Sequence, residues 1–230
     1  MGSFVSGLAA ALPDTVIFGG MLREFSLGKS REFCSDLDLV TCQSAEKIES
    51  VLSAFNWQKN RFGGYRVCVH GWQYDLWSLK DTWAARAGHV ECSSFDDLLD
   101  TTFFDIDSAA FHISSRKLIV SSRHLRAVSS RVLGINLVEN PSPRAMAKRA
   151  VRMALENDFS LTRELAEYVI EHHEGGYSAT LEAAYVRSLE SIVSATSAQT
   201  IHPVLQPDFF ADQLDVRRKC FQIRRSSDSL

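Results

Sequence analysis

The first half of the chain alternates short apolar runs with short helical patterns. Apolar or alternating runs predict β-strands at 15–18, 36–42, 65–69, 73–79, 110–113 and 118–120. Three-to-four-residue spacing and capping residues predict helices at 21–27, from Ser44 to about Phe55, and from Ser93 or Ser94 to Leu99. Turn residues separate these segments, so this half is predicted to be an α/β domain.

The second half shows helical spacing. A helix is expected to begin at Pro143, and another at Ser160 or Thr162 that ends at Gly175-Gly176. Two more are expected at 179–193 and 207–221. The sequence therefore predicts two domains, 1–122 and 123–230, of which the second is helical.

The composition is that of an ordinary globular protein. Hydrophobic residues make up 45% of the 230 residues and charged residues 23%. No stretch approaches the roughly 18 apolar residues of a membrane span, and residues 1–14 lack the basic start of a secretory signal. The five cysteines are scattered without a C-x-x-C pair, which argues against a zinc ribbon or a disulfide framework. We expect a cytoplasmic protein with no membrane partner.

The net charge of −3 conceals a segregation of charge along the chain. Residues 91–115 contain six acids and no Lys or Arg, whereas residues 116–152 contain nine basic residues and one acid. Arg144, Lys148 and Arg152 are four residues apart and should share one helix face. A basic segment of this kind suits a phosphate-bearing ligand such as RNA, and the alternative is a solvated helix face.

Two aspartates occupy alternate positions of the predicted strand 36–42. Asp36 and Asp38 should project from the same face, with Leu37 and Leu39 in the core behind them. Two adjacent carboxylates favour a hard cation, Mg²⁺ or Mn²⁺. Asp75, an isolated acid in an apolar strand pattern, is the candidate for a third metal ligand. Alternatively, Asp36 and Asp38 are solvated and Asp75 pairs with an arginine.

A glycine turn precedes the aspartate strand. Gly19 and Gly20 lie between a predicted strand and a predicted helical turn, where backbone amides can approach a triphosphate. Arg23 follows on the first helical turn and is expected to reach the same phosphates. A Gly-Gly turn, an arginine and two alternate aspartates together indicate nucleotide chemistry more specifically than any one of them.

Several segments resemble one family. F-G-G-M-L-R-E at 18–24, Gly28 and S-D-L-D-L-V at 35–40 are similar to the head domain of class II CCA-adding enzymes and bacterial poly(A) polymerases, which belong to the nucleotidyltransferase superfamily of the DNA polymerase β type. F-D-I-D-S-A-A-F at 104–111 and P-R-A-M-A-K-R-A-V-R at 143–152 resemble two further motifs of that family more weakly. The resemblance implies an α+β fold, a mixed sheet with flanking helices followed by a helical domain.

The same resemblance implies roles for single residues. Asp36, Asp38 and Asp75 would be the catalytic, metal-holding carboxylates. The nucleoside triphosphate, ATP for example, would be bound by Gly19, Gly20, Arg23, Asp107, Arg144, Arg149 and Arg152.

The predicted function is metal-dependent transfer of a nucleotide from a triphosphate to an acceptor hydroxyl. The resemblance and the basic segment favour an RNA 3′ end, such as that of a tRNA, as the acceptor. A protein or a small molecule as acceptor is the alternative among enzymes. The alternative from another class is an inactive module that senses nucleotides or binds a protein, which is favoured by Thr101-Thr102-Phe103 standing where the family has R-R-D.

Overall fold

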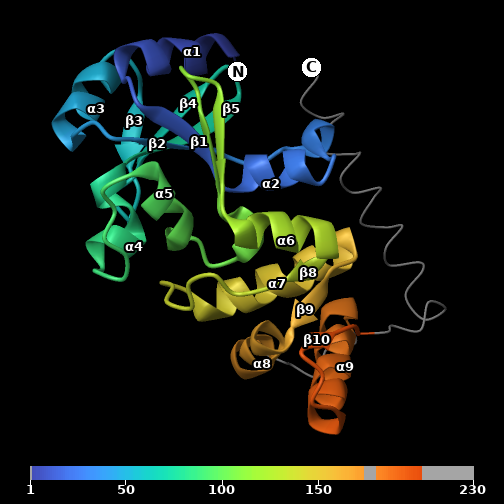
Figure 1. The fold of residues 1–230 in the computed structure, drawn as a ribbon. Coiled ribbons are helices and arrows are strands. Elements are labelled where there is room, and N and C mark those ends of the chain that lie inside the picture. Colours follow the sequence, from blue (N-terminus) through green and yellow to red (C-terminus); the bar gives the residue numbers. More distant parts are fainter. Residues whose placement is uncertain (1, 174–179, 204–230) are drawn as a thin grey trace. The chain divides into compact units, whose positions relative to one another are not determined.

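The structure, a computed structural model, describes residues 2–173 and 180–203 (Figure 1). The predicted helix end at Gly175-Gly176 and the predicted helix at 207–221 lie outside the described residues. The chain divides into two compact units, Met1–Pro141 and Ser142–Leu230. None of the described helices is long and apolar enough to cross a membrane.

A seven-stranded mixed sheet forms the centre of the first unit. Its strand order is β3-β4-β5-β2-β1-β6-β7. The strands span Thr15–Phe18 (β1), Leu37–Thr41 (β2), Trp57–Lys59 (β3), Tyr65–Val69 (β4), Trp72–Ser78 (β5), Ala109–His112 (β6) and Lys117–Val120 (β7). Only the β2–β5 pair is parallel among the pairings of these strands. The predicted mixed sheet with flanking helices is confirmed.

Short helices connect and cover these strands. The α-helices are Gly2–Ala11 (α1), Gly20–Ser26 (α2), Ala45–Leu52 (α3), Trp83–Arg86 (α4), Phe95–Leu98 (α5) and Ser122–Ser130 (α6). Single 3₁₀ turns occupy Ser30–Glu32 (η1), Leu79–Asp81 (η2), Leu99–Thr101 (η3) and Asp105–Asp107 (η4). The hydroxyl of Ser44 accepts a hydrogen bond from the Lys47 amide and caps α3, as its sequence predicts.

The two faces of the sheet bury different cores. Leu37 and Leu39 of β2 pack in one core with residues of α1 and α3. Val40, one position away and therefore on the opposite face, packs in a second core with residues of α5 and partly buried residues of α4. Figure 1 shows α1 and α3 apart from α4 and α5 around these strands. The second face is thus apolar where α4 and α5 cover it and polar at the other end of β2.

The second unit, described by itself, is mainly helical. It contains Pro143–Asn157 (α7), Arg163–His172 (α8) and Leu181–Ala195 (α9). Two short strands, Ser160–Thr162 (β9) and Thr200–Ile201 (β10), pair antiparallel. Pro143 stands in the first turn of α7, and the Thr162 hydroxyl caps α8 by accepting from the Leu165 amide. The predicted helical character is confirmed for the described residues of this unit.

The boundary between the units follows Pro141, whereas the sequence placed it after residue 122. Helix α6 accounts for the difference, because it packs within the first unit. His124 of α6 is buried, and its Nδ1 lies 2.7 Å from the Ile106 carbonyl oxygen of η4. The short strand Val132–Leu133 (β8) follows α6 in the same unit. Such contacts between separate elements cannot be predicted from the spacing of residues within one element.

Candidate active site

Three aspartates share the polar end of one sheet face. Asp38 of β2 and Asp75 of β5 are directly opposite each other in the parallel pair. Residues opposite each other in a sheet project from the same face, and Asp36 projects from that face as well because it lies two positions before Asp38. Asp75 is buried, whereas Asp36 and Asp38 are partly exposed. The topology therefore brings together the three carboxylates that the sequence singled out.

An arginine from the next strand binds two of these carboxylates. Arg66 of β4 stands opposite Asp75 in the antiparallel β4–β5 pair. Its Nε and Nη2 donate to Asp75 Oδ1 and Oδ2 over 2.8 and 2.6 Å, and Nη2 also lies 3.2 Å from Asp36 Oδ2. The hydrogen bonds that Arg66 donates to Asp75 raise the pKa of Arg66 above its ordinary value against the opposing effect of burial. The arginine partner that the sequence left open for Asp75 is therefore Arg66.

Asp75 differs from Asp36 and Asp38 in how fully its carboxylate is paired. Among the described residues, no group of three or more His, Cys, Asp or Glu side chains is placed to hold a metal ion. Both oxygens of Asp75 face the Arg66 guanidinium. Asp36 and Asp38 lie on the partly exposed part of the face, and carboxylate oxygens are the donors that Mg²⁺ and Mn²⁺ prefer.

The glycine turn lies against the aspartate strand. Gly19 has a φ of +74°, which side chains other than glycine adopt rarely, and it is the N-cap of α2. A Cβ added to Gly19 would lie 3.5 Å from Asp38 Oδ2, so the backbone of the turn passes directly beside that carboxylate. Phe18, the residue before the turn, is the register partner of Asp38 on β1. The predicted phosphate-binding turn and the predicted metal ligands are therefore neighbours.

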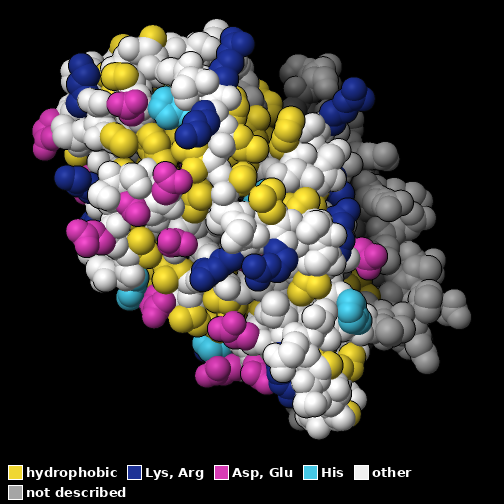
Figure 2. Space-filling view, viewed as in Figure 1, with side chains coloured by type: hydrophobic (Ala, Val, Ile, Leu, Met, Phe, Trp, Pro, Cys, Tyr) yellow, Lys and Arg dark blue, Asp and Glu magenta, His cyan; other side chains and the backbone are white. Residues whose placement is uncertain are grey.

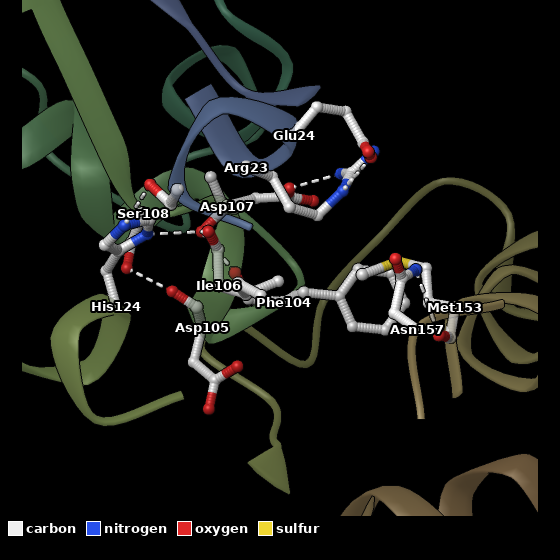
Figure 3. A network of polar contacts seen from close by, with 12 residues as sticks. Arg23, Glu24, Phe104, Asp105, Ile106, Asp107, Ser108, His124, Met153 and Asn157 are labelled. Atoms are coloured by element: carbon white, nitrogen blue, oxygen red, sulfur yellow. Dashed lines mark hydrogen bonds and ion pairs between the residues drawn. The ribbon is translucent and has the colours of Figure 1, made fainter. Parts of the chain in front are cut away.

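Arg23 forms a buried ion pair (Figure 3), and its guanidinium lies next to Gly20 of this turn. Its Nη1 is 2.5 Å from Asp107 Oδ1 of η4, and its Nε is 3.1 Å from Glu24 Oε1. The Arg23 side chain is 12% exposed and that of Asp107 is 9% exposed. Burial alone would lower the pKa of Arg23, but Asp107 and Glu24 outweigh burial and raise it. Arg23 and Asp107 were predicted to bind nucleotide, and in the structure their ion pair links α2 to η4.

Two more contacts extend this connection. The Nε2 of His124 lies 3.1 Å from the Ser26 hydroxyl at the end of α2, while its Nδ1 faces the Ile106 carbonyl oxygen. One buried imidazole thus joins α2, η4 and α6 (Figure 3). Neither His124 nor Ser26 was singled out from the sequence, because their contact spans 98 residues.

Asp105, at the start of η4, has a distinct environment. Its Oδ1 is buried and has no hydrogen-bond partner among the described residues. Burial raises the pKa of the Asp105 carboxyl to about 6, although the backbone amides of Gly134 and Ile106 oppose that shift. The pKa of Asp105 therefore lies closer to neutral pH than that of an ordinary aspartate.

Side chains of the acidic segment 91–115 and of the basic segment 116–152 are exposed on the surface. Figure 2 shows acidic side chains gathered over α4 and α5 in the first unit. In the second unit, Arg144, Lys148 and Arg152 are exposed on α7, and Arg149 is half-buried. The opposite side of α7 is buried through Ala147, Ala150, Val151 and Ala154. The three exposed residues share one face of α7, as their spacing predicts.

Comparison with solved structures identifies the fold. A tRNA-processing enzyme solved with CTP matches 74% of this chain with a TM-score of 0.54 and 20% identity. The Bacillus stearothermophilus CCA-adding enzyme in complex with CTP matches 74% with a TM-score of 0.52 and 17% identity. The Thermotoga maritima CCA-adding enzyme complexed with tRNA_CCA matches 76% with a TM-score of 0.51 and 18% identity. The chain has the fold of CCA-adding enzymes.

The resemblance read from the sequence motifs is thereby confirmed for this nucleotidyltransferase fold. The chain spans less than half the length of these structures: 45%, 42% and 42% of them are covered. No family model and no curated protein matches the chain. Within the nucleotidyltransferase fold, the arrangement of Asp36, Asp38 and the Gly19 turn is the part suited to hold a metal ion next to a phosphate.

Proposed function

We propose that this protein is a metal-dependent nucleotidyltransferase. The observation that carries the proposal is the juxtaposition of Asp36 and Asp38 with the Gly19 turn on a partly exposed part of the sheet, in a chain with the fold of CCA-adding enzymes. An acceptor hydroxyl oxygen forms a bond to the α-phosphorus of a nucleoside triphosphate. The bond from that phosphorus to the bridging oxygen breaks, pyrophosphate leaves with the electron pair, and the hydroxyl proton is released.

The residues have separate tasks in this proposal. Asp36 and Asp38 hold Mg²⁺ or Mn²⁺, which when bound polarises the α-phosphate and favours the deprotonated acceptor oxygen. Gly19 and Gly20 let backbone amides approach the phosphates without a side chain in between. Arg23, which lies next to Gly20, and its partner Asp107 support the turn, so their contribution to nucleotide binding is the position of the turn. Asp75 fixes Arg66 beside the two metal-holding carboxylates.

We favour RNA as the acceptor. The exposed basic face of α7 carries the positive charge that a phosphate backbone requires. The matched structures are described as enzymes that process tRNA or add CCA, and one is a complex with tRNA. A protein or small-molecule acceptor, or an inactive nucleotide-binding module, is the competing proposal. The inactive module is favoured by Thr101-Thr102-Phe103 and by the involvement of Arg23 and Asp107 in a buried pair.

The test is a transfer assay with each of the four α-labelled triphosphates, Mg²⁺ and a mixture of total RNA and protein extract. Label in RNA that is lost with Asp38→Asn supports the proposal, and label in protein identifies the other acceptor class. Asp14→Asn is the matched control, because Asp14 is exposed, has a positive φ that Asn tolerates, and precedes β1 at the end away from Gly19. Absence of labelled product with every triphosphate would contradict the enzyme assignment.

A further inference from the structure

Arg66 binds both carboxylate oxygens of Asp75, the third predicted metal ligand. The register of β4 on β5 sets Arg66 directly opposite Asp75, so the backbone places the two side chains next to each other. The contact is bidentate, which is the strongest geometry for an arginine and a carboxylate. The Asp75 side chain is 8% exposed, so a charge there needs a permanent partner. A divalent ion on Asp75 would face the guanidinium at close range and be repelled by it.

Charge balance leads to the same conclusion. Asp36, Asp38, Asp75 and Arg66 together carry a formal charge of −2. One divalent ion neutralises this group, and a second would leave it at +2 before any phosphate arrives. Because Nη2 of Arg66 reaches both Asp75 and Asp36, the guanidinium also holds Asp36 in place. Arg66 therefore neutralises one carboxylate of the site and orients another.

We propose that Arg66 is a built-in cation of this site, so that Asp36 and Asp38 hold a single divalent ion and Asp75 binds Arg66 instead of metal. The proposal rests on the proposed function, because it specifies how many ions that site takes. Arg66 is a positioning residue in this scheme, and it acts through Asp36 and Asp75. The predicted three-carboxylate, two-ion site is replaced by two carboxylates, one ion and one guanidinium.

The experiment counts Mn²⁺ bound per chain at saturation, using the electron paramagnetic resonance signal of free Mn²⁺ and no nucleotide. Wild type should bind one ion at this site, and Asp38→Asn should weaken that binding by more than about tenfold. Arg66→Met should gain a second ion, because it releases Asp75 for coordination. The Arg66→Met/Asp75→Asn double variant keeps the formal charge at −2 and should return to one ion, bound more weakly than in wild type because Asp36 has lost the guanidinium that holds it.

The double variant keeps the test decisive if Arg66→Met alone fails to fold with an unpaired buried carboxylate. Two ions in wild type, two ions in the double variant, or no second ion in a folded Arg66→Met would each overturn the inference. The transfer assay distinguishes failure of this inference from failure of the proposed function. Transfer with two bound ions refutes only the role of Arg66, whereas no bound Mn²⁺ and no transfer refute both.

Discussion

Replacing Arg23 tests whether it supports the glycine turn or binds nucleotide. In Arg23→Met the aliphatic part of the side chain is kept and the charge is lost, which leaves Asp107 buried without its guanidinium partner. Both side chains are about nine-tenths buried. Breaking a buried ion pair by removing one partner costs about 3–5 kcal/mol. For a chain of 230 residues, each kcal/mol lowers Tm by roughly 2–4 °C, so we expect a fall of roughly 6–20 °C.

The assay is thermal unfolding followed by circular dichroism, combined with a double-mutant cycle. Arg23→Met/Asp107→Asn should recover part of the loss, because the unpaired charge is removed. Lys59→Met is the matched control: the ion pair of Lys59 with Glu49 is about half exposed, so its removal should cost less than about 1 kcal/mol. If Arg23→Met unfolds like wild type while KM for the triphosphate rises, Arg23 binds nucleotide and the reasoning from burial is refuted.

Three further predictions concern the metal site, pH and RNA. Asp38→Asn should abolish transfer with a Tm near that of wild type, because Asp38 is partly exposed; transfer at the wild-type rate would exclude a metal role. The pKa of Asp105 is raised from 3.8 to about 6, so its contribution to stability is full below pH 4 and is lost as the pH rises through 6. The Tm advantage of Asp105→Asn over wild type should therefore grow between pH 4 and 7, and an advantage independent of pH would contradict that environment. Changing Arg144, Lys148 and Arg152 to Gln should reduce the slope of log K for RNA against log salt concentration by about two, at roughly 0.7 for each of three lost phosphate contacts. An unchanged slope would exclude this face of α7 as the RNA-binding surface.

Local sequence patterns predicted the elements that present the site. Strand β1 has the predicted bounds, because its apolar run ends at the glycines of a turn. The neighbouring positions of Asp36 and Asp38 follow from the two-residue period of a strand alone. Helix α1 was not predicted, since its small residues show little contrast between apolar and polar positions.

The partners of the site residues depend on which strands and helices meet, and the sequence does not show this. Arg66 stands inside a correctly predicted strand as a single charged residue, but its contact with Asp75 exists only because β4 lies beside β5 in one register. Asp107 was placed near nucleotide by motif similarity, and its pairing with Arg23 bridges 84 residues. Spacing along one strand or helix is therefore predictable here, whereas pairing between elements required the structure.

Because Asp38 lies between Leu37 and Leu39 on a strand whose other face is fully buried, folding and assembly of the site are one event. A slip of β2 by one residue against β5 would turn both leucines outward and Asp38 into the apolar core. Burial of the hydrophobic core thus selects the one strand register that places Asp38 in the site. During refolding, amide protection of β2 and β5 and binding of the divalent ion should return with a single rate constant. A chain in the wrong register would be unable to persist as a folded but inactive species.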